Sequence, residues 1–264
     1  MMLIRNIEKI KGAVRDAPLV RRFAFAGFEV ELDRTTLDRI KRDTEKTFTS
    51  LIKETNSEIK VFSEGLFIAD RLESAAWAII NSFFGQTPIP PASQLRFTVH
   101  IPDVIFQDFL YQLTEYFHPA STAGGRKAGR RFSSRYGIIG LAWRTFTSRG
   151  VGAAFQGSAQ RTQQLIEHWS MTPGEAQEAK KKPSCIAVMV KDEIFKKPRG
   201  LIYFDSELVN LFGNDQQAAA FSSRCESIQE VVELGNALLE LERFSSQLKI
   251  GINLAELVNN EHNS

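Results

Sequence analysis

The sequence predicts an α/β fold of the α+β type, an antiparallel sheet flanked by helices. In residues 95–101, LRFTVHI, apolar and polar side chains alternate, which is the period of a strand with one buried face. Residues 185–191, CIAVMVK, are apolar on both faces, which is typical of a strand inside a sheet. The polar segment 192–199 joins that strand to a further one at 200–206, and so short a connection requires antiparallel pairing.

The N-terminal part of the chain is predicted as an extended segment followed by two helices. Residues 19–32 alternate in polarity, which indicates a strand or a bent hairpin arm. Asp33 can cap a helix that runs to about Ser57 with a narrow apolar stripe. A second, more apolar helix is expected over residues 61–84.

A proline-rich segment separates these helices from the sheet. Residues 85–93, GQTPIPPAS, contain three prolines, which exclude helix and favour an extended path. We therefore place a domain boundary or hinge within or just before this segment. Beyond the strand at 95–101, a second strand is expected at 109–117, FLYQLTEYF.

The C-terminal part of the chain is predicted as a long helix. Apolar residues follow a three-four spacing from Ile228 to Leu248, and glutamates occupy other positions of the same helix. Such a stripe can pack on the sheet or against a second copy of itself. Packing within the chain is the favoured interpretation.

The composition is that of a globular protein without a dominant charge. The chain has 264 residues, of which 43% are hydrophobic and 24% charged, and its formal net charge of +2 cannot support nucleic-acid binding by the whole surface. Two cysteines, Cys185 and Cys225, are too few for a disulfide framework or a thiolate metal site. Neither a signal peptide nor a membrane-spanning stretch is evident, so we expect a cytoplasmic protein.

The sequence carries no recognisable catalytic or metal-binding signature. None of its four histidines lies in a known nucleophile motif, and no two of them have metal-ligand spacing. Cys185 lies in an apolar strand, where burial raises the pKa of a thiol and makes it unreactive. We therefore expect no catalytic residue, no metal and no cofactor.

Residues 123–137, AGGRKAGRRFSSRYG, form a basic loop that is suited to an anion. Guanidinium groups form bidentate hydrogen bonds to phosphate or carboxylate, and glycines let backbone amides approach closely. A solvated loop without a ligand is an equal alternative. Binding of single-stranded nucleic acid is a weaker one: Phe132 and Tyr136 interleave with the arginines, but no nucleic-acid-binding motif is present.

Three segments of the chain resemble a GAF domain, a small α/β sensory module of signalling proteins. They are GIIGLAWRT at 137–145, the stretch from HWSMTP into CIAVMVK at 168–191, and PRGLIYFDS at 198–206, which is followed by LFGNDQQAAAF. The resemblance covers about Arg71 to Leu248. It implies a GAF-like domain at 71–250, preceded by a strand-plus-helix extension at 1–70 and followed by a C-terminal tail at 251–264.

The resemblance further implies a six-stranded antiparallel sheet with helices behind it and a ligand pocket in front. Residues 121–183 would roof the pocket. Gly137 and Gly140 would allow a tight turn and close packing on the sheet, and Trp143 would anchor the short helix. Arg144 could face the cavity or pair with Asp205. The predicted ligand-binding residues are Arg130, Arg131, Phe132, Tyr136, Arg144 and Trp169.

Departures from the family narrow the expected function. The signature N-K-x(n)-F-x(3)-D-E of cyclic-nucleotide GAF domains is absent, and residues 121–183 contain no cysteine for bilin attachment or for methionine sulfoxide reduction. We therefore expect a non-enzymatic sensory or regulatory protein that binds a small anionic ligand such as a nucleotide. It would signal through its flanking helices, and would dimerise through the helix at 228–248. The alternative is a ligand-free adaptor that docks partner proteins through residues 1–84.

Overall fold

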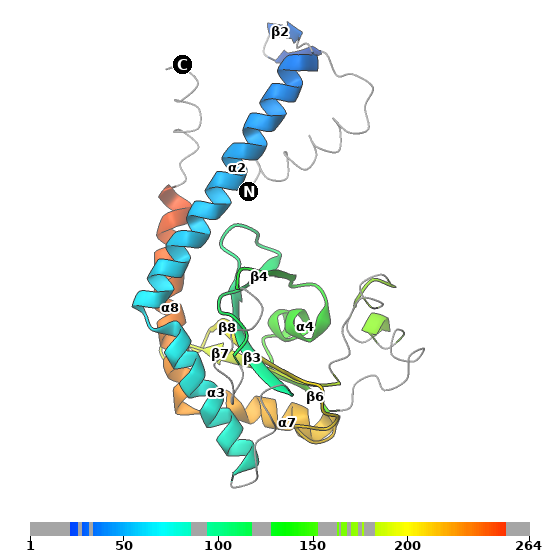
Figure 1. The fold of residues 1–264 in the computed structure, drawn as a ribbon, viewed down its shortest axis with the longest axis vertical. Coiled ribbons are helices and arrows are strands. Elements are labelled where there is room, and N and C mark those ends of the chain that lie inside the picture. The colour runs from blue at the N-terminus through cyan, green and yellow to red at the C-terminus, as the bar shows by residue number, and fades with distance from the viewer. Residues whose placement is uncertain are drawn as a thin grey trace. The chain divides into compact units, whose positions relative to one another are not determined.

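The computed structural model describes residues 22–25, 28–31, 34–85, 94–117, 128–152, 163, 165–167, 170–173, 176 and 183–251 (Figure 1). The chain divides into two compact units, Met1–Glu54 and Thr55–Ser264. The domain limits at residues 70 and 250 come from the sequence resemblance to a GAF domain, and they stay a prediction. Among the described residues, no helix combines the length and the apolar character needed to cross a membrane.

The first unit contains a short hairpin and the start of a long helix. Strands β1 (Arg22–Phe25) and β2 (Phe28–Glu31) pair antiparallel, which confirms an extended hairpin within residues 19–32. Helix α2 spans Arg34–Gly65 and so passes the end expected near Ser57. It continues because residues 34–64 contain neither glycine nor proline, the two residues that most disfavour a helix interior.

The second unit is built on a six-stranded sheet in the order β5-β4-β3-β8-β7-β6. Every neighbouring pair is antiparallel, as predicted. The strands are β3 (Leu95–Pro102), β4 (Phe109–Gln112), β5 (Arg131–Ser133), β6 (Arg149–Val151), β7 (Ser184–Lys191) and β8 (Pro198–Ser206).

Strand β4 is shorter than the predicted 109–117. It ends at Gln112. Beyond it, the backbone N–H of Leu113 donates to the carbonyl of Val99 (3.0 Å), and an isolated bridge joins Phe117 to Phe97. The side chain of Thr114 interrupts the ladder, because its hydroxyl accepts a hydrogen bond from the backbone N–H of Val99 (3.3 Å). The hydroxyl of Thr98 in turn donates to the carbonyl of Thr114 (2.9 Å).

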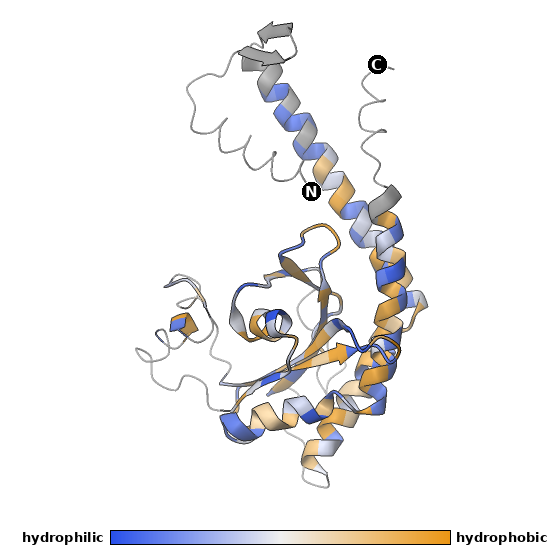
Figure 2. Cartoon of the chain, turned by 180° about the vertical axis from the view of Figure 1, so that it is seen from behind, coloured by the Kyte–Doolittle hydropathy of each residue, from blue (hydrophilic) through white to orange (hydrophobic). Residues whose placement is uncertain are grey.

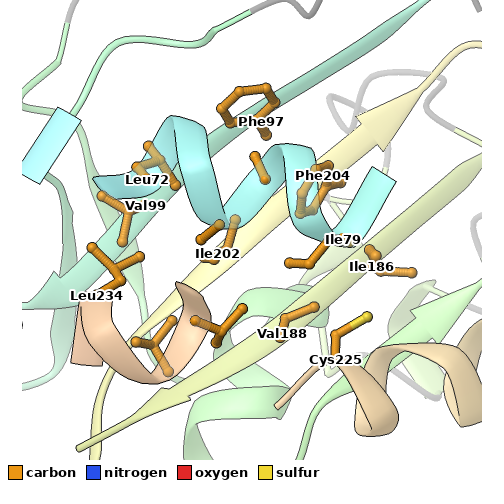
Figure 3. Packing of buried hydrophobic residues seen from close by; sticks show 14 of the residues in the cluster. Leu72, Ile79, Phe97, Val99, Ile186, Val188, Ile202, Phe204, Cys225 and Leu234 are labelled. Atoms are coloured by element: carbon orange, nitrogen blue, oxygen red, sulfur yellow. The ribbon is translucent and has the colours of Figure 1, made fainter. Parts of the chain in front are cut away.

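Three helices cover one face of the sheet: α3 (Ile68–Phe84), α7 (Asp215–Cys225) and α8 (Gln229–Gly251) (Figure 1). The main core lies between these helices and the sheet. It includes Leu72, Ile79, Phe97, Val99, Ile186, Val188, Ile202, Phe204, Cys225 and Leu234 (Figure 3). Figure 2 shows hydrophobic residues gathered in the strands and in the helices behind them.

The predicted C-terminal stripe is part of this core. Val231, Leu234, Leu238 and Leu241 of α8 are at most 2% exposed, which confirms packing within the chain. These four side chains are therefore not available to a second copy. The sheet and α3 occupy that face of the helix, and dimerisation through the other faces of the 228–248 helix stays a prediction.

The second predicted helix begins later than residue 61. Leu66 and Phe67 form a turn between α2 and α3, and Phe67 has a left-handed backbone with φ of 53°. Helix α4 (Gly137–Thr145) lies over the opposite face of the sheet, which we call the front face (Figure 1). A second, smaller apolar cluster joins α4 to this face through Ile138, Ile139, Ala142, Cys185, Ala187, Met189 and Leu201.

Candidate functional site

The front face of the sheet carries an unusual number of polar side chains near its centre. Successive residues of a strand point to opposite faces, so Phe97 and Val99 enter the main core while Arg96, Thr98 and His100 face the front. Cross-strand pairing sets Asp205 beside Arg96 and Tyr203 beside Thr98. Thr98, His100 and Asp205 are at most 2% exposed, so most of this polar surface is buried.

Arg96 and Asp205 form a bidentate ion pair on this face. Arg96 donates from Nε to Oδ1 (2.7 Å) and from Nη2 to Oδ2 (2.9 Å) of Asp205. The guanidinium of Arg96 also stacks over the ring of Tyr116, with Cζ 4.1 Å from the ring centroid. Burial, aided by the charge of Asp205, raises the pKa of Tyr116 to about 12, so its hydroxyl stays protonated at neutral pH.

Arg130 approaches Tyr116 from a different element. Its Nε donates to Oε1 of Gln112 (2.8 Å), and Nε2 of Gln112 donates to the carbonyl of Thr114 (2.7 Å). The guanidinium lies 5.3 Å from the ring of Tyr116 and 5.1 Å from the ring of Phe132. Arg130 is thus half-buried and held in place on the front face, with aromatic rings on two sides.

His100 is the feature of this face that ordinary packing does not explain. Among the described residues, neither of its ring nitrogens has a hydrogen-bond partner, although the side chain is fully buried. Burial, together with the positive charge of Arg130, lowers the pKa of His100 to about 3. The neutral ring carries one donor and one acceptor, and leaving both unmet inside a protein costs free energy. A buried polar group without a protein partner is met by a bound water, an ion or a ligand, or is held there for a functional reason.

The two cysteines occupy opposite faces and are both buried. Cys185 faces the front, and Cys225 belongs to the main core. Burial raises the pKa of the Cys185 thiol far above its usual range and that of Cys225 to about 12. Both therefore stay protonated, which leaves neither as a thiolate nucleophile at neutral pH. Within the described part of the chain, no group of three or more His, Cys, Asp and Glu side chains is arranged to hold a metal.

The structure brings together only part of the predicted ligand set. Arg130 and Phe132 meet on the front face beside His100. Tyr136 precedes α4 as its N-cap residue and is half-buried. Arg144 is exposed in the last turn of α4, and the carboxylate of Asp205, one predicted partner of Arg144, is bonded by Arg96 instead.

Arg131 lies on the opposite face of the sheet from Arg130. It follows Arg130 directly, and strand geometry turns the two side chains to opposite sides of the sheet. Its Nε forms an ion pair with Oδ2 of Asp103 (2.5 Å), and its Nη2 donates to Oδ1 of Asn56 in α2 (3.2 Å). These contacts hold Arg131 away from Arg130 and Phe132. Trp169 lies outside the described residues, as does the start of the basic loop.

Sequence reasoning missed Arg96, His100, Tyr116 and Tyr203. The alternation in residues 95–101 does place Arg96, Thr98 and His100 on one face, but it says nothing about whether that face meets solvent. The missing information was the position of β3 in the middle of the sheet, between β4 and β8. A polar face on an interior strand is a stronger signal than a polar face on an edge strand.

The glycines of GIIGLAWRT act as expected. Gly137 has a φ of 72°, a left-handed conformation that favours glycine at the start of α4. A Cβ at Gly140 would lie 2.9 Å from the carbonyl oxygen of Ser133, so only glycine lets the helix pack this closely on β5. Trp143 is half-buried against the front cluster, with its ring edge on Phe146.

Comparison with known proteins finds similarity to solved structures and none at the level of sequence families. No protein-family model matches the sequence, and no curated protein matches it. A free methionine-R-sulfoxide reductase from Neisseria meningitidis, solved with its substrate, is 18% identical, with 72% of this chain and 92% of that chain covered and a TM-score of 0.39. A GAF domain structure is 14% identical, covering 69% and 88%, with a TM-score of 0.36. A GAF domain of A. aeolicus in an inactive state is also 14% identical, covering 74% and 98%, with a TM-score of 0.34.

The arrangement of strands and helices predicted from the sequence is present in this chain. It consists of six antiparallel strands with helices behind them and a short glycine-bracketed helix in front. Similarities at the level of these TM-scores say nothing about activity or ligand. What the front face can do follows from its own side chains, namely two arginines, two tyrosines and a neutral buried histidine.

Proposed function

We propose that this chain is a non-enzymatic sensory or regulatory protein that binds a small anionic ligand, such as a nucleotide, on the front face of its sheet. The observation that carries the proposal is His100, which is buried next to the guanidinium of Arg130 with both ring nitrogens unmet by any described residue. A ligand with an anionic group for Arg130, and with a donor and an acceptor for the imidazole, would satisfy both residues. Because His100 is 0% exposed, such a ligand reaches the imidazole only when the atoms that cover it move aside.

The aromatic surroundings favour a ligand with a planar part. The rings of Phe132 and His100 are nearly perpendicular with their centroids 4.8 Å apart, and the ring of Tyr203 lies 6.2 Å from that of His100. Flat aromatic walls together with a few fixed polar groups are typical of small-molecule sites. A nucleotide, with a planar base and an anionic phosphate, combines the two properties.

The chemistry of the face supports binding rather than catalysis. Both thiols are buried with raised pKa values, and no carboxylate of the described residues orients the neutral imidazole of His100 as a base. The ion pair between Arg96 and Asp205 engages the carboxylate that lies on this face. These features favour the non-enzymatic assignment.

Arg130 offers a connection from the ligand to a flanking helix. It is followed in the chain by Arg131, whose side chain contacts Asn56 of α2. A ligand that binds one arrangement of these elements better than another would shift the population toward that arrangement.

The proposal is tested by thermal unfolding in the presence of a panel of nucleotides, sugar phosphates and carboxylates. At least one anion is expected to raise the unfolding temperature of the wild type, and Arg130→Gln should abolish that response. Arg135→Gln is the matched control, because Arg135 is exposed and pairs with Asp108 at the surface. Absence of any response, or an equal response in both variants, would overturn the proposal and favour the ligand-free adaptor.

A further inference from the structure

The turn between α2 and α3 presents an aromatic side chain to solvent. Phe67 is 63% exposed and has a left-handed φ of 53°, a conformation that is costly for a bulky residue. The turn is fixed by backbone hydrogen bonds from Phe67 N to Glu64 O (3.0 Å) and from Arg71 N to Phe67 O (3.0 Å). On the last turns of α2, Val61 is 65% exposed. One exposed aromatic side chain is ordinary by itself, so the significance of Phe67 depends on what lies beside it.

Two adjacent hollows flank Phe67 and form a groove along α8. Their volumes are about 330 and 480 Å³, and both are lined by Phe67, Arg71 and Glu233. The lining includes the small or apolar residues Gly65, Leu66 and Ala237. Its charged residues are mainly acidic, with Arg71 as the exception, and the acidic ones are Asp70, Glu230, Glu233 and Glu240.

The hairpin that joins β7 to β8 ends in a tip that carries lysines, whereas the groove carries mainly acidic residues. At this tip, residues 193–197, Ile194 is 70% and Phe195 is 53% exposed, and they are followed by the exposed Lys196 and Lys197. The fully buried Asp192 holds the tip rigid by accepting hydrogen bonds from Phe195 N (2.5 Å) and Lys197 N (3.3 Å). The tip therefore offers two apolar side chains and two lysines beside one acidic residue, Glu193, and its fixed backbone lowers the ordering cost on binding.

The tip and the groove lie next to each other on the same chain. Asn236 lines the larger hollow, and its Oδ1 accepts a hydrogen bond from the backbone N–H of Glu193, the residue before Ile194 (2.9 Å). One copy therefore presents a basic, apolar tip beside an acidic, apolar groove. A two-fold axis near Asn236 would place the tip of each copy in the groove of the other. The same contact between tip and groove would then form twice in the dimer.

We propose that this surface joins two copies of the chain, with Ile194 and Phe195 packing against Phe67 of the second copy and Lys197 facing its Glu233. The occupant is a second copy rather than another basic segment because the chain itself supplies both complementary parts. The contact uses none of the buried α8 stripe. It also needs no ligand, so it stands or falls independently of the proposed function.

The test is sedimentation velocity of the full chain over a concentration series without ligand. The wild type is expected to dimerise, and Phe67→Asn to raise the dimer dissociation constant at least ~10-fold, since buried aromatic anchors carry much of an interface's energy. Asn adopts the left-handed conformation readily, so the substitution relieves backbone strain and should not impair folding. Phe146→Asn is the matched control, because Phe146 is 56% exposed with a φ of 50° but lies at the end of α4.

Charge exchange tests the register of the contact. Lys197→Glu should weaken the dimer about 5-fold, and Lys197→Glu combined with Glu233→Lys should restore most of that loss. A wild type that remains monomeric at every concentration would overturn the proposal. Equal dimerisation of the Phe67→Asn and Phe146→Asn variants, or no recovery in the double charge variant, would also overturn it.

Discussion

Adjacent arginines in this chain have different roles because a strand turns successive side chains to opposite faces. Arg130 lies among aromatic rings on the front face, and Arg131 pairs with Asp103 on the other. The sequence could predict that both belong to a basic loop, but not that this loop enters the sheet as β5. The strand is three residues long and too short to show an alternation of its own.

The structural role of Arg131 leads to a stability prediction. The carboxylate of Asp103 is 1% exposed, so Arg131→Ala leaves a buried charge with only backbone donors and should lower the free energy of unfolding by about 3 kcal/mol. Arg135→Ala removes an exposed pair with Asp108 and should cost less than about 1 kcal/mol. Urea unfolding at pH 7 measures both. Equal effects would refute the assignment of Arg131 as structural.

His100 predicts a specific dependence of stability on pH. Its pKa falls from 6.5 in the unfolded chain to about 3 in the folded one, so between these values the unfolded state binds a proton that the folded state does not. This group alone should therefore lower the free energy of unfolding by about 1.4 kcal/mol per pH unit as pH falls below 6.5. His100→Leu should remove this contribution. Urea unfolding from pH 7 to 4.5 measures the free energy of unfolding of both proteins. An identical pH dependence in wild type and variant would exclude a buried neutral His100.

At the scale of elements, the packing of α8 on the β7–β8 hairpin depends on a glycine. A Cβ at Gly235 would lie 2.1 Å from the carbonyl oxygen of Lys191, so the helix could not keep its position. Gly235→Ala should lower the free energy of unfolding by about 2 to 3 kcal/mol, although alanine is the better helix former. A Cβ at Gly65, near the end of α2, would meet no atom within 4 Å, so Gly65→Ala should raise stability by roughly 0.5 to 1 kcal/mol. Thermal and urea unfolding should show a loss of stability for Gly235→Ala and a gain for Gly65→Ala. A gain in stability for Gly235→Ala would contradict the close packing of α8.

Local patterns predicted most of the elements but not all their limits. Alternation identified β3, and two-sided apolar character identified β7 as a strand inside the sheet. The prediction ends α2 too early because charged residues after Ser57 conceal the continuing helical period. The prediction for β4 is too long because the side chain of Thr114, and not a glycine or proline, breaks the ladder. Side-chain interruptions of this kind depend on the neighbouring strand and leave no local mark.

At the scale of the whole molecule, one sheet separates two different interiors. The face toward α3 and α8 is an apolar core, and the front face combines a smaller apolar cluster with buried polar groups. The predicted fold class, strand number and antiparallel pairing are all confirmed. The site was predictable only in part, because it joins residues from β3, β5 and β8 that are up to 109 positions apart in sequence, as Arg96 and Asp205 are.

The central claim is that the front face binds an anion through Arg130 and His100, and NMR of histidine-labelled protein tests it most directly. The chain has four histidines, and the signal missing in His100→Leu identifies His100. We predict that its imidazole stays neutral down to about pH 4, since the pKa is about 3, and that its ring resonances shift when the stabilising anion is added. If His100 titrates near pH 6.5 and its resonances do not shift with any anion, the front face does not bind an anion through Arg130 and His100.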